Sequence, residues 1–266
     1  MTATRDDRAA IDKAVSLLLS FGDEASTGLG VSELSRRAGL SKSTTFRVLG
    51  VLVRNGVVEK EGSRYRLGSR LYDLGTQVYS AAHMQICEIL TPFGADLLEM
   101  TRQTVHLAAL RGTDVVYLGK LYGHHPIASP SRIGGLVPAH GTAVGKVLLA
   151  FDSAAFDAVT DQELPALTPR TITDPLLLAS QLMRVRQTGV AYDDQEAAPD
   201  LTCVAAPVFG VNGRVVAAIS VSGRVGTFEP RSHAAVLRKV VQAASQALHR
   251  AGIGSTSGQT RNALAS

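Results

Sequence analysis

The 266-residue sequence has no tryptophan, two cysteines and few aromatic residues. Two cysteines, Cys87 and Cys203, are too few for a disulfide framework or a cysteine-rich zinc site. Aromatic residues make up 5% of the chain, which argues against extended surfaces that stack on unpaired bases. No apolar run reaches the roughly 18 residues of a transmembrane helix, and the charged start lacks the apolar stretch of a signal peptide. We therefore expect a cytoplasmic protein with no membrane partner.

Positive charge is concentrated in one short segment. The chain has 27 Lys and Arg against 23 Asp and Glu, yet residues 36–70 alone hold nine basic and two acidic side chains. A solvated basic face could have this composition, but such a segment is also typical of a surface that meets nucleic-acid phosphates.

The basic segment has the pattern of a winged helix-turn-helix. Helices are predicted over residues 8–20, 31–39 and 42–54, with Ser41 as the cap of the third and Gly39 in the turn before it. Two short strands, residues 57–60 and 64–67, follow as a hairpin. In such motifs the second helix of the pair enters the major groove of DNA.

The helix over residues 42–54 is amphipathic and carries its charge on one side. Its apolar face holds Val48, Leu49 and Leu52, and the opposite face holds Arg47 and Arg54. We expect the following residues of this helix, its cap and the wing to contact double-stranded operator DNA: Ser41, Lys42, Ser43, Thr44, Phe46, Arg47, Arg54, Arg64 and Arg66.

The rest of the chain alternates predicted helices and strands. A linker helix over residues 68–83 has an apolar stripe of Leu71, Leu74 and Val78, which could pair with a second copy of the chain. Further helices are predicted at 84–103 (kinked or split at Pro92), 141–151, 174–188 and 230–252. Strands are predicted at 104–112, 113–123, 190–196, 201–210 and 214–223. A mostly antiparallel sheet covered by helices is the economical arrangement.

Three stretches, residues 31–75, 134–150 and 189–223, together resemble the IclR family of bacterial transcriptional regulators. The resemblance implies an α+β fold in which an N-terminal winged helix-turn-helix is joined by a linker helix to a GAF/PAS-like effector-binding domain. It also implies homodimers, or dimers of dimers, that regulate catabolic genes. The expected divisions are a DNA-binding domain at 8–67, the linker at 68–83, the effector-binding domain at 84–251 and a disordered tail at 252–266.

The resemblance also implies an effector pocket between the sheet and the loop before the 141–151 helix. The matching positions are Ala143, Val144, Asp193, Cys203, Ser220 and Ser222. Either Asp193 or Asp194 could be the acid that faces the pocket. Ser220 and Ser222 point to one face of a strand, and two hydroxyls opposite a helix N-terminus suit a carboxylate. The expected effector is a small organic acid, aliphatic or aromatic.

Other chemistries fit the sequence less well. The segment GTAVGKV at 141–147 resembles a phosphate-binding loop but lacks its first glycine and its final Ser or Thr, so Lys146 is expected at the helix surface. The adjacent His124 and His125 lack metal-site spacing, and neither a metal nor a cofactor is expected. Two alternatives remain open. One is an enzyme fused to a helix-turn-helix, for which no nucleophile and base can be assembled from the spacing. The other is a protein-interaction module that docks through the winged helix.

Overall fold

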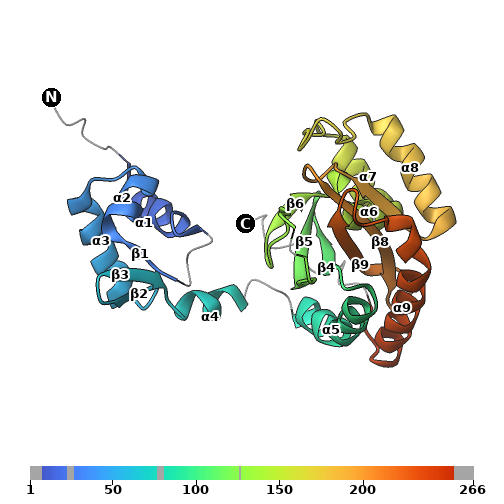
Figure 1. The fold of residues 1–266 in the computed structure, drawn as a ribbon, viewed down its shortest axis with the longest axis horizontal. Helices are drawn as coiled ribbons and strands as arrows, with labels where there is room; N and C mark the ends of the chain where they lie inside the picture. The colour runs from blue at the N-terminus through green and yellow to red at the C-terminus, as the bar shows by residue number, and fades with distance from the viewer. Residues whose placement is uncertain (1–7, 23–26, 77–80, 126, 255–266) are drawn as a thin grey trace, which may run out of the picture. The chain divides into compact units, whose positions relative to one another are not determined.

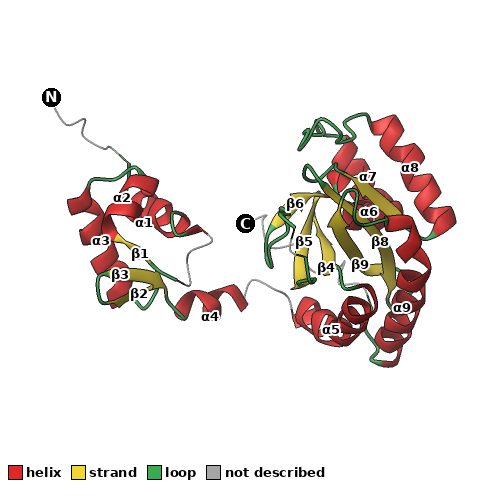
Figure 2. Ribbon diagram, viewed as in Figure 1, coloured by secondary structure: helices red, strands yellow, loops and turns green. Residues whose placement is uncertain are grey.

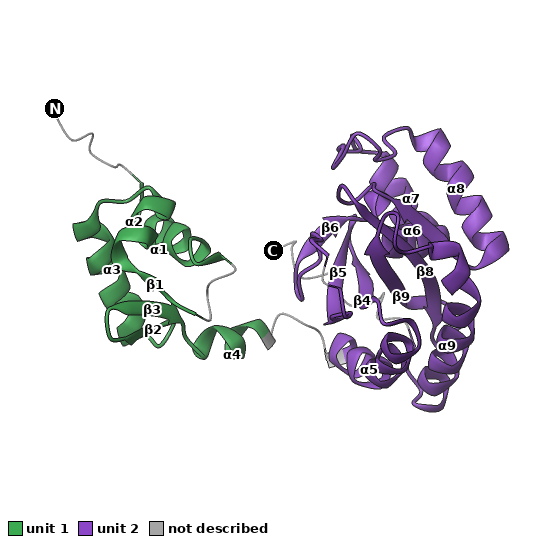
Figure 3. Ribbon diagram, viewed as in Figure 1, with its two compact units in different colours: residues 1–80 green, residues 81–266 purple. Residues whose placement is uncertain are grey.

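The computed structural model describes residues 8–22, 27–76, 81–125 and 127–254 (Figure 1). The chain forms two compact units, residues 1–80 and 81–266 (Figure 3). Each unit has its own hydrophobic core, and each is described separately below.

The N-terminal unit packs three helices against a small antiparallel sheet of strand order β1-β3-β2. Its elements are α1 (Ala10–Leu19), β1 (Leu29–Gly30), α2 (Val31–Ala38), α3 (Lys42–Arg54), β2 (Val58–Glu61) and β3 (Arg64–Leu67). This arrangement confirms the predicted winged helix-turn-helix. Strand β1 was not predicted, because two residues carry no periodicity and only pairing with β3 makes them a strand.

Local capping explains the tight turn between α2 and α3. Gly39 ends α2 in the left-handed conformation, with φ of 62°, which glycine adopts without steric cost. Ser41 then begins α3, where its Oγ accepts a hydrogen bond from the N–H of Thr44 at 3.2 Å. Leu17, Leu34 and Leu49 bring the three helices together in the core.

The linker region differs from the single helix predicted over residues 68–83. Helix α4 spans Arg70–Thr76 and α5 spans Ala81–Thr101, while residues 77–80, including Val78 of the predicted stripe, lie outside the described residues. Pro92 lies inside α5 without dividing it.

The C-terminal unit is built on a six-stranded sheet of order β6-β5-β4-β9-β8-β7, in which all neighbouring strands are antiparallel. Its strands are β4 (Thr104–Arg111), β5 (Asp114–Leu121), β6 (Leu136–Pro138), β7 (Ala191–Asp194), β8 (Leu201–Phe209) and β9 (Val215–Arg224). Together with the winged unit, this confirms the predicted α+β fold.

Helices cover both faces of this sheet (Figure 2). Helices α5 and α9 (Pro230–Arg250) lie on one face, and α6 (Ala143–Ala150), α7 (Ser153–Thr160) and α8 (Pro175–Thr188) lie on the other. A 3₁₀ turn, η2 (Ala139–Gly141), precedes α6. As predicted, Asp174 caps α8. Helix α7, capped by Asp152, was not predicted.

Two boundaries need correction. Helix α6 begins two residues later than predicted, because Thr142 caps it by accepting the N–H of Gly145 at 2.9 Å. The predicted tail at 252–266 includes Ile253, whose carbonyl accepts the N–H of Val211 at 3.0 Å, so the prediction of disorder is wrong at this residue. Residues 255–266 lie outside the described residues. Among the described helices, none combines the length and apolar character needed to cross a membrane.

Candidate functional site

One face of the sheet carries a row of polar side chains beneath α6. The strand register places Asp193, Cys203, Ser222 and Thr104 side by side across four strands. His106 and Ser220 form a pair in the next row. Alternate residues of a strand face the same side, so these polar groups share the face on which α6 packs.

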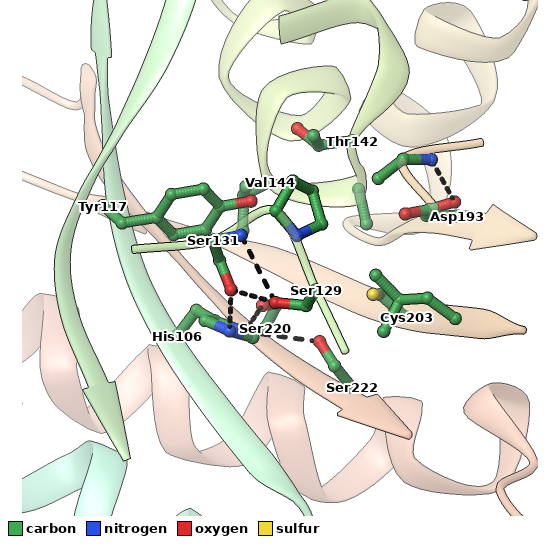
Figure 4. Close-up of a pocket in the computed structure, with 14 residues that line it drawn as sticks. His106, Tyr117, Ser129, Ser131, Thr142, Val144, Asp193, Cys203, Ser220 and Ser222 are labelled. Atoms are coloured by element: carbon green, nitrogen blue, oxygen red, sulfur yellow. Dashed lines mark hydrogen bonds between the residues drawn. The ribbon is translucent and has the colours of Figure 1, made fainter. Parts of the chain in front are cut away.

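All of these side chains except Thr104 line a pocket (Figure 4). All six residues predicted to bind an effector line it: Ala143, Val144, Asp193, Cys203, Ser220 and Ser222. Sequence reasoning missed several others: His106, Tyr117, Ser129, Ser131 and Thr142. The alternation of β4 could have identified His106 as inward-facing, whereas no periodicity identifies the residues of the 129–131 loop.

The pocket is small in this conformation. Its volume is about 20 Å³, which is on the order of the space that one water needs. The 129–131 loop, Thr142 and Ala197 are lining residues that belong to neither the sheet nor a helix. An organic ligand of several atoms therefore requires the wall to move.

The start of α6 supplies backbone donors to the pocket. Ala143 and Val144 are the first two helical residues and line the pocket. Their N–H groups have no hydrogen-bond acceptor among the residues that the structure describes. Unpaired N–H groups at a helix N-terminus attract anions, because the helix dipole adds positive potential there.

Asp193, and not Asp194, is the acid at the pocket. Asp193 is buried, and its Oδ1 accepts the N–H of Glu196 at 2.7 Å. Asp194 points the other way and pairs with Arg170 at 2.6 Å on the surface. Burial raises the pKa of Asp193 to about 7, partly opposed by the hydrogen bond from Glu196. At neutral pH this carboxyl is therefore poised between its charged and uncharged forms.

Lys146 is buried, contrary to the prediction that its charge lies at the surface. Its side chain is 1% exposed, and its Nζ lies 2.5 Å from Oε1 of Glu196 and 3.1 Å from Oε1 of Gln181. The second oxygen, Oε2 of Glu196, is buried with no hydrogen-bond partner in the described residues. A buried lysine requires such a partner, and here the partner lies 50 residues away in the sequence.

His106 connects the strand serines to the 129–131 loop. Its Nδ1 lies 3.3 Å from Oγ of Ser222 and 3.4 Å from Oγ of Ser220, and its Nε2 lies 2.7 Å from Oγ of Ser131. Burial, with a smaller contribution from Lys120, lowers the pKa of His106 to about 3. The ring is therefore neutral at physiological pH.

The side chains at the pocket bear on two kinds of chemistry, a cysteine nucleophile and a metal site. Burial raises the pKa of the Cys203 thiol well above its ordinary value, so the thiolate that a nucleophile needs is scarce. Within the described ranges, no group of three or more His, Cys, Asp and Glu side chains is arranged to hold a metal ion.

The exposed face of α3 carries the basic residues expected to contact DNA. Lys42, Arg47 and Arg54 are exposed, and no carboxylate within the described part of the chain forms an ion pair with them. Ser43 and Phe46 are also exposed, and Phe46 is 60% accessible. Ser41 and Thr44, in contrast, are bonded to each other at the start of the helix.

The wing arginines differ from those of α3 because the domain itself holds them. Arg64 donates to the backbone carbonyl of Gly28 at 3.1 Å. Arg66 pairs with Glu59 at 2.8 Å and lies 3.7 Å from Glu61. Arg64 and Arg66 thus remain predicted DNA contacts, but each would share its charge with an internal partner.

Comparison with known proteins identifies the family. Residues 10–62 match the IclR helix-turn-helix domain, and residues 78–249 match the C-terminal domain of the bacterial transcriptional regulator IclR. The chain belongs to the IclR family. Its similarity to the HTH-type transcriptional regulator XynR of Escherichia coli is 33% identity over 246 residues, which cover 91% of this chain and 96% of the relative.

Solved structures of the family share this fold over nearly the whole regulator. The crystal structure of IclR from Thermotoga maritima has a TM-score of 0.73 and 29% identity, covering 91% of this chain and 97% of the other. An IclR homologue from Microbacterium hydrocarbonoxydans, solved in complex with 4-hydroxybenzoate, has a TM-score of 0.72 and 26% identity, covering 91% and 100%. The chain is thus a DNA-binding transcriptional regulator. Its relatives favour neither the enzyme nor the docking-module alternative.

The raised pKa of Asp193 predicts a pH-dependent stability. Between the ordinary value of 3.8 and the folded value of about 7, the folded regulator holds a proton that the unfolded chain releases. This contribution stabilises the fold at low pH and is lost as the pH rises through about 7. Denaturant unfolding should show a larger loss of stability from pH 5 to pH 8 in the wild type than in Asp193→Asn. Parallel profiles for the two proteins would contradict the assignment.

Proposed function

We propose that this regulator binds operator DNA through α3 and its wing, and that a small organic acid in the pocket changes its affinity for that DNA. The observation that carries the effector proposal is the pair of unpartnered N–H groups at Ala143 and Val144, opposite the hydroxyls of Ser220 and Ser222. Because the target is chromosomal DNA, we also propose that the protein acts in the cytoplasm.

The pocket has one pole suited to a carboxylate and one suited to the body of the ligand. Backbone N–H groups at a helix start and serine hydroxyls can all donate to a carboxylate oxygen. Val144 and Leu201 supply apolar wall. Asp193 would repel an anion when charged, but with a pKa of about 7 it can be protonated and donate a hydrogen bond instead. The 4-hydroxybenzoate bound to the Microbacterium relative is an acid of this class.

The α3 surface supports DNA contact by Lys42, Arg47 and Arg54, with Phe46 beside them. Arginine can make two hydrogen bonds to guanine in the major groove, and an exposed Phe can contact a thymine methyl group. The wing residues Arg64 and Arg66 are better placed for phosphate contacts, which position the protein without reading the sequence.

We also propose that the regulator is a homodimer, which can pair further into a tetramer. On α1, Ile11 and Leu19 are each 76% exposed, and Val15 lies between them on the same stripe. On α4, Tyr72 and Leu74 are exposed as well. Apolar side chains repeated along a helix and left uncovered by their own domain favour a second copy as partner.

The effector proposal is tested by calorimetry with a panel of small aliphatic and aromatic acids that includes 4-hydroxybenzoate. Ser220→Ala and Ser222→Ala should each weaken binding by about ten- to a hundredfold, since a hydrogen bond to a charged group contributes about 1.5–3 kcal/mol. Ser232→Ala, at an exposed position on α9, should bind as the wild type does. A ligand that releases the regulator from DNA and binds both pocket variants at full strength would place the site elsewhere.

The DNA proposal is tested by titration of a selected operator at several salt concentrations. Arg47→Ala should weaken binding by roughly 1–3 kcal/mol and relax the sequence preference, as expected for a base contact. Arg66→Ala should cost less, because its guanidinium is already paired with Glu59. Arg184→Ala, exposed on α8, is the matched control. Unchanged affinity for Arg47→Ala would remove this face of α3 from the groove.

The dimer proposal is tested by light scattering of the full-length chain at micromolar concentration. The wild type should have the mass of a dimer or a tetramer, and the double variant Ile11→Glu/Leu19→Glu should shift toward monomer because its apolar stripe is broken. Leu176→Glu, at an equally exposed leucine on α8, should leave the N-terminal pairing intact. A monomeric wild type would refute the proposal.

A further inference from the structure

Lys120 lies beside the pocket without lining it. It is the cross-strand neighbour of His106 on β5, and its Nζ donates to the 129–131 loop. The acceptors are the carbonyl of Ser131 at 2.9 Å, Oγ of Ser131 at 3.1 Å and Oγ of Ser129 at 3.3 Å. All three are neutral oxygens, and within the part of the chain that the structure describes no carboxylate forms an ion pair with Lys120.

The charge of Lys120 fixes the direction of the hydrogen bonds around it. An ammonium group can only donate, so Oγ of Ser131 and Oγ of Ser129 both accept from it. Ser129 also accepts the backbone N–H of Ser131 at 3.3 Å, which leaves its own hydroxyl hydrogen for the adjacent Oγ of Ser131. The hydrogen of Ser131 then goes to its remaining neighbour, Nε2 of His106, at 2.7 Å.

The hydrogen-bond direction at Nε2 of His106 determines the direction at its other ring nitrogen, Nδ1. A neutral imidazole has one N–H donor and one acceptor nitrogen, and burial keeps this ring neutral. If Nε2 accepts from Ser131, then Nδ1 holds the proton and donates to Ser220 and Ser222 (Figure 4). The single N–H is then shared between the two serine oxygens, so neither hydroxyl hydrogen is held by Nδ1 and both are available to a ligand. The hydroxyl of Ser222 also lies within hydrogen-bond reach of the Cys203 thiol.

We propose that Lys120, acting through Ser131 and His106, sets Ser220 and Ser222 as hydrogen-bond donors and so selects a ligand oxygen that only accepts, such as a carboxylate. In the opposite tautomer, Nδ1 has one lone pair and would accept the hydroxyl hydrogen of one of the two serines. That serine would then present only acceptor capacity to the pocket, which would suit a hydroxyl or ammonium group of the ligand. Lys120 is a positioning residue for ligand choice, because it acts on the ligand through Ser131, His106 and the two strand serines.

The tautomer can be measured on the ligand-free, full-length protein. Nitrogen-15 labelling of histidine and two-bond proton–nitrogen correlation spectra distinguish a protonated ring nitrogen from an unprotonated one, and His106→Gln assigns the signals. At pH 7 the wild type should show a neutral ring with its proton on Nδ1. A proton on Nε2 would overturn the proposal without any substitution.

Substitutions at Lys120 then test its part in the chain. In Lys120→Met, the Oγ of Ser131 no longer receives a hydrogen bond from Lys120, so it can accept one from the N–H at Nε2 of His106. The nitrogen-15 spectra of His106 should then show the proton on Nε2, or a mixture of the two tautomers. Lys120→Arg keeps a positively charged donor at this position, so His106 should keep its proton on Nδ1. Lys239→Met, an exposed lysine on α9 at the opposite face of the sheet, should change nothing. A folded Lys120→Met variant that keeps the wild-type tautomer would show that Lys120 does not set it.

Ligand choice is the second readout, and it rests on the effector proposed above. Calorimetry compares an acid with its primary amide, beginning with 4-hydroxybenzoate and 4-hydroxybenzamide and extending to whichever acid of the panel binds. The preference for the acid should fall at least tenfold in Lys120→Met and stay unchanged in Lys239→Met. An unchanged preference in Lys120→Met would refute the selection. If no acid binds the wild type, the effector proposal fails, while the tautomer still decides whether Lys120 directs the serines.

Discussion

The buried ion pair between Lys146 and Glu196 holds together the two segments on which the pocket depends. Lys146 belongs to α6, whose first N–H groups face the pocket, and Glu196 follows β7, where its own N–H binds Asp193. Removing either partner from such a pair typically costs about 3–5 kcal/mol, because a charge is left buried and uncompensated. Because separating Lys146 from Glu196 costs this free energy, the ion pair keeps the start of α6 and Asp193 close together, although they are far apart in the sequence.

The buried polar groups of the pocket form a second set of constraints. His106, Ser131 and Thr142 are each almost fully buried, and each has at least one hydrogen-bond partner in the chain. Among the residues that the structure describes, the pocket-facing N–H groups of α6 and Oε2 of Glu196 have none. Buried polar atoms without partners are rare in folded proteins. The unsatisfied donors gather at the place where the proposed carboxylate would lie, while the unsatisfied acceptor lies beside the ion pair.

The sequence predicted those features whose deciding residues lie close together along the chain. Periodicity and caps predicted α2, α3, α8 and most strands, because the deciding residues lie within a few positions of one another. The choice between Asp193 and Asp194 could not be made that way, since neighbours on a strand face opposite sides and both are acids. The prediction that Lys146 lies at the surface was wrong because its partner, Glu196, is 50 residues away in the sequence. A helical lysine with no partner nearby in the sequence is usually solvent-exposed.

The two units use their positive charge in opposite ways, which bears on how one could control the other. On α3, Lys42 and Arg47 are exposed and available to a phosphate or a base, whereas Lys120 and Lys146 are fully engaged inside the C-terminal unit. A pocket of about 20 Å³ cannot accept an organic acid without opening. The proposed effector would therefore bind a rearranged form, and it could shift the DNA-binding equilibrium only to the extent that it binds this form more tightly than the closed one. Lys120 ties the 129–131 loop to the sheet through the same hydrogen bonds that lead to His106 and the two serines. The proposed ligand choice therefore requires these bonds to persist in the rearranged form, so the opening has to involve another part of the pocket wall.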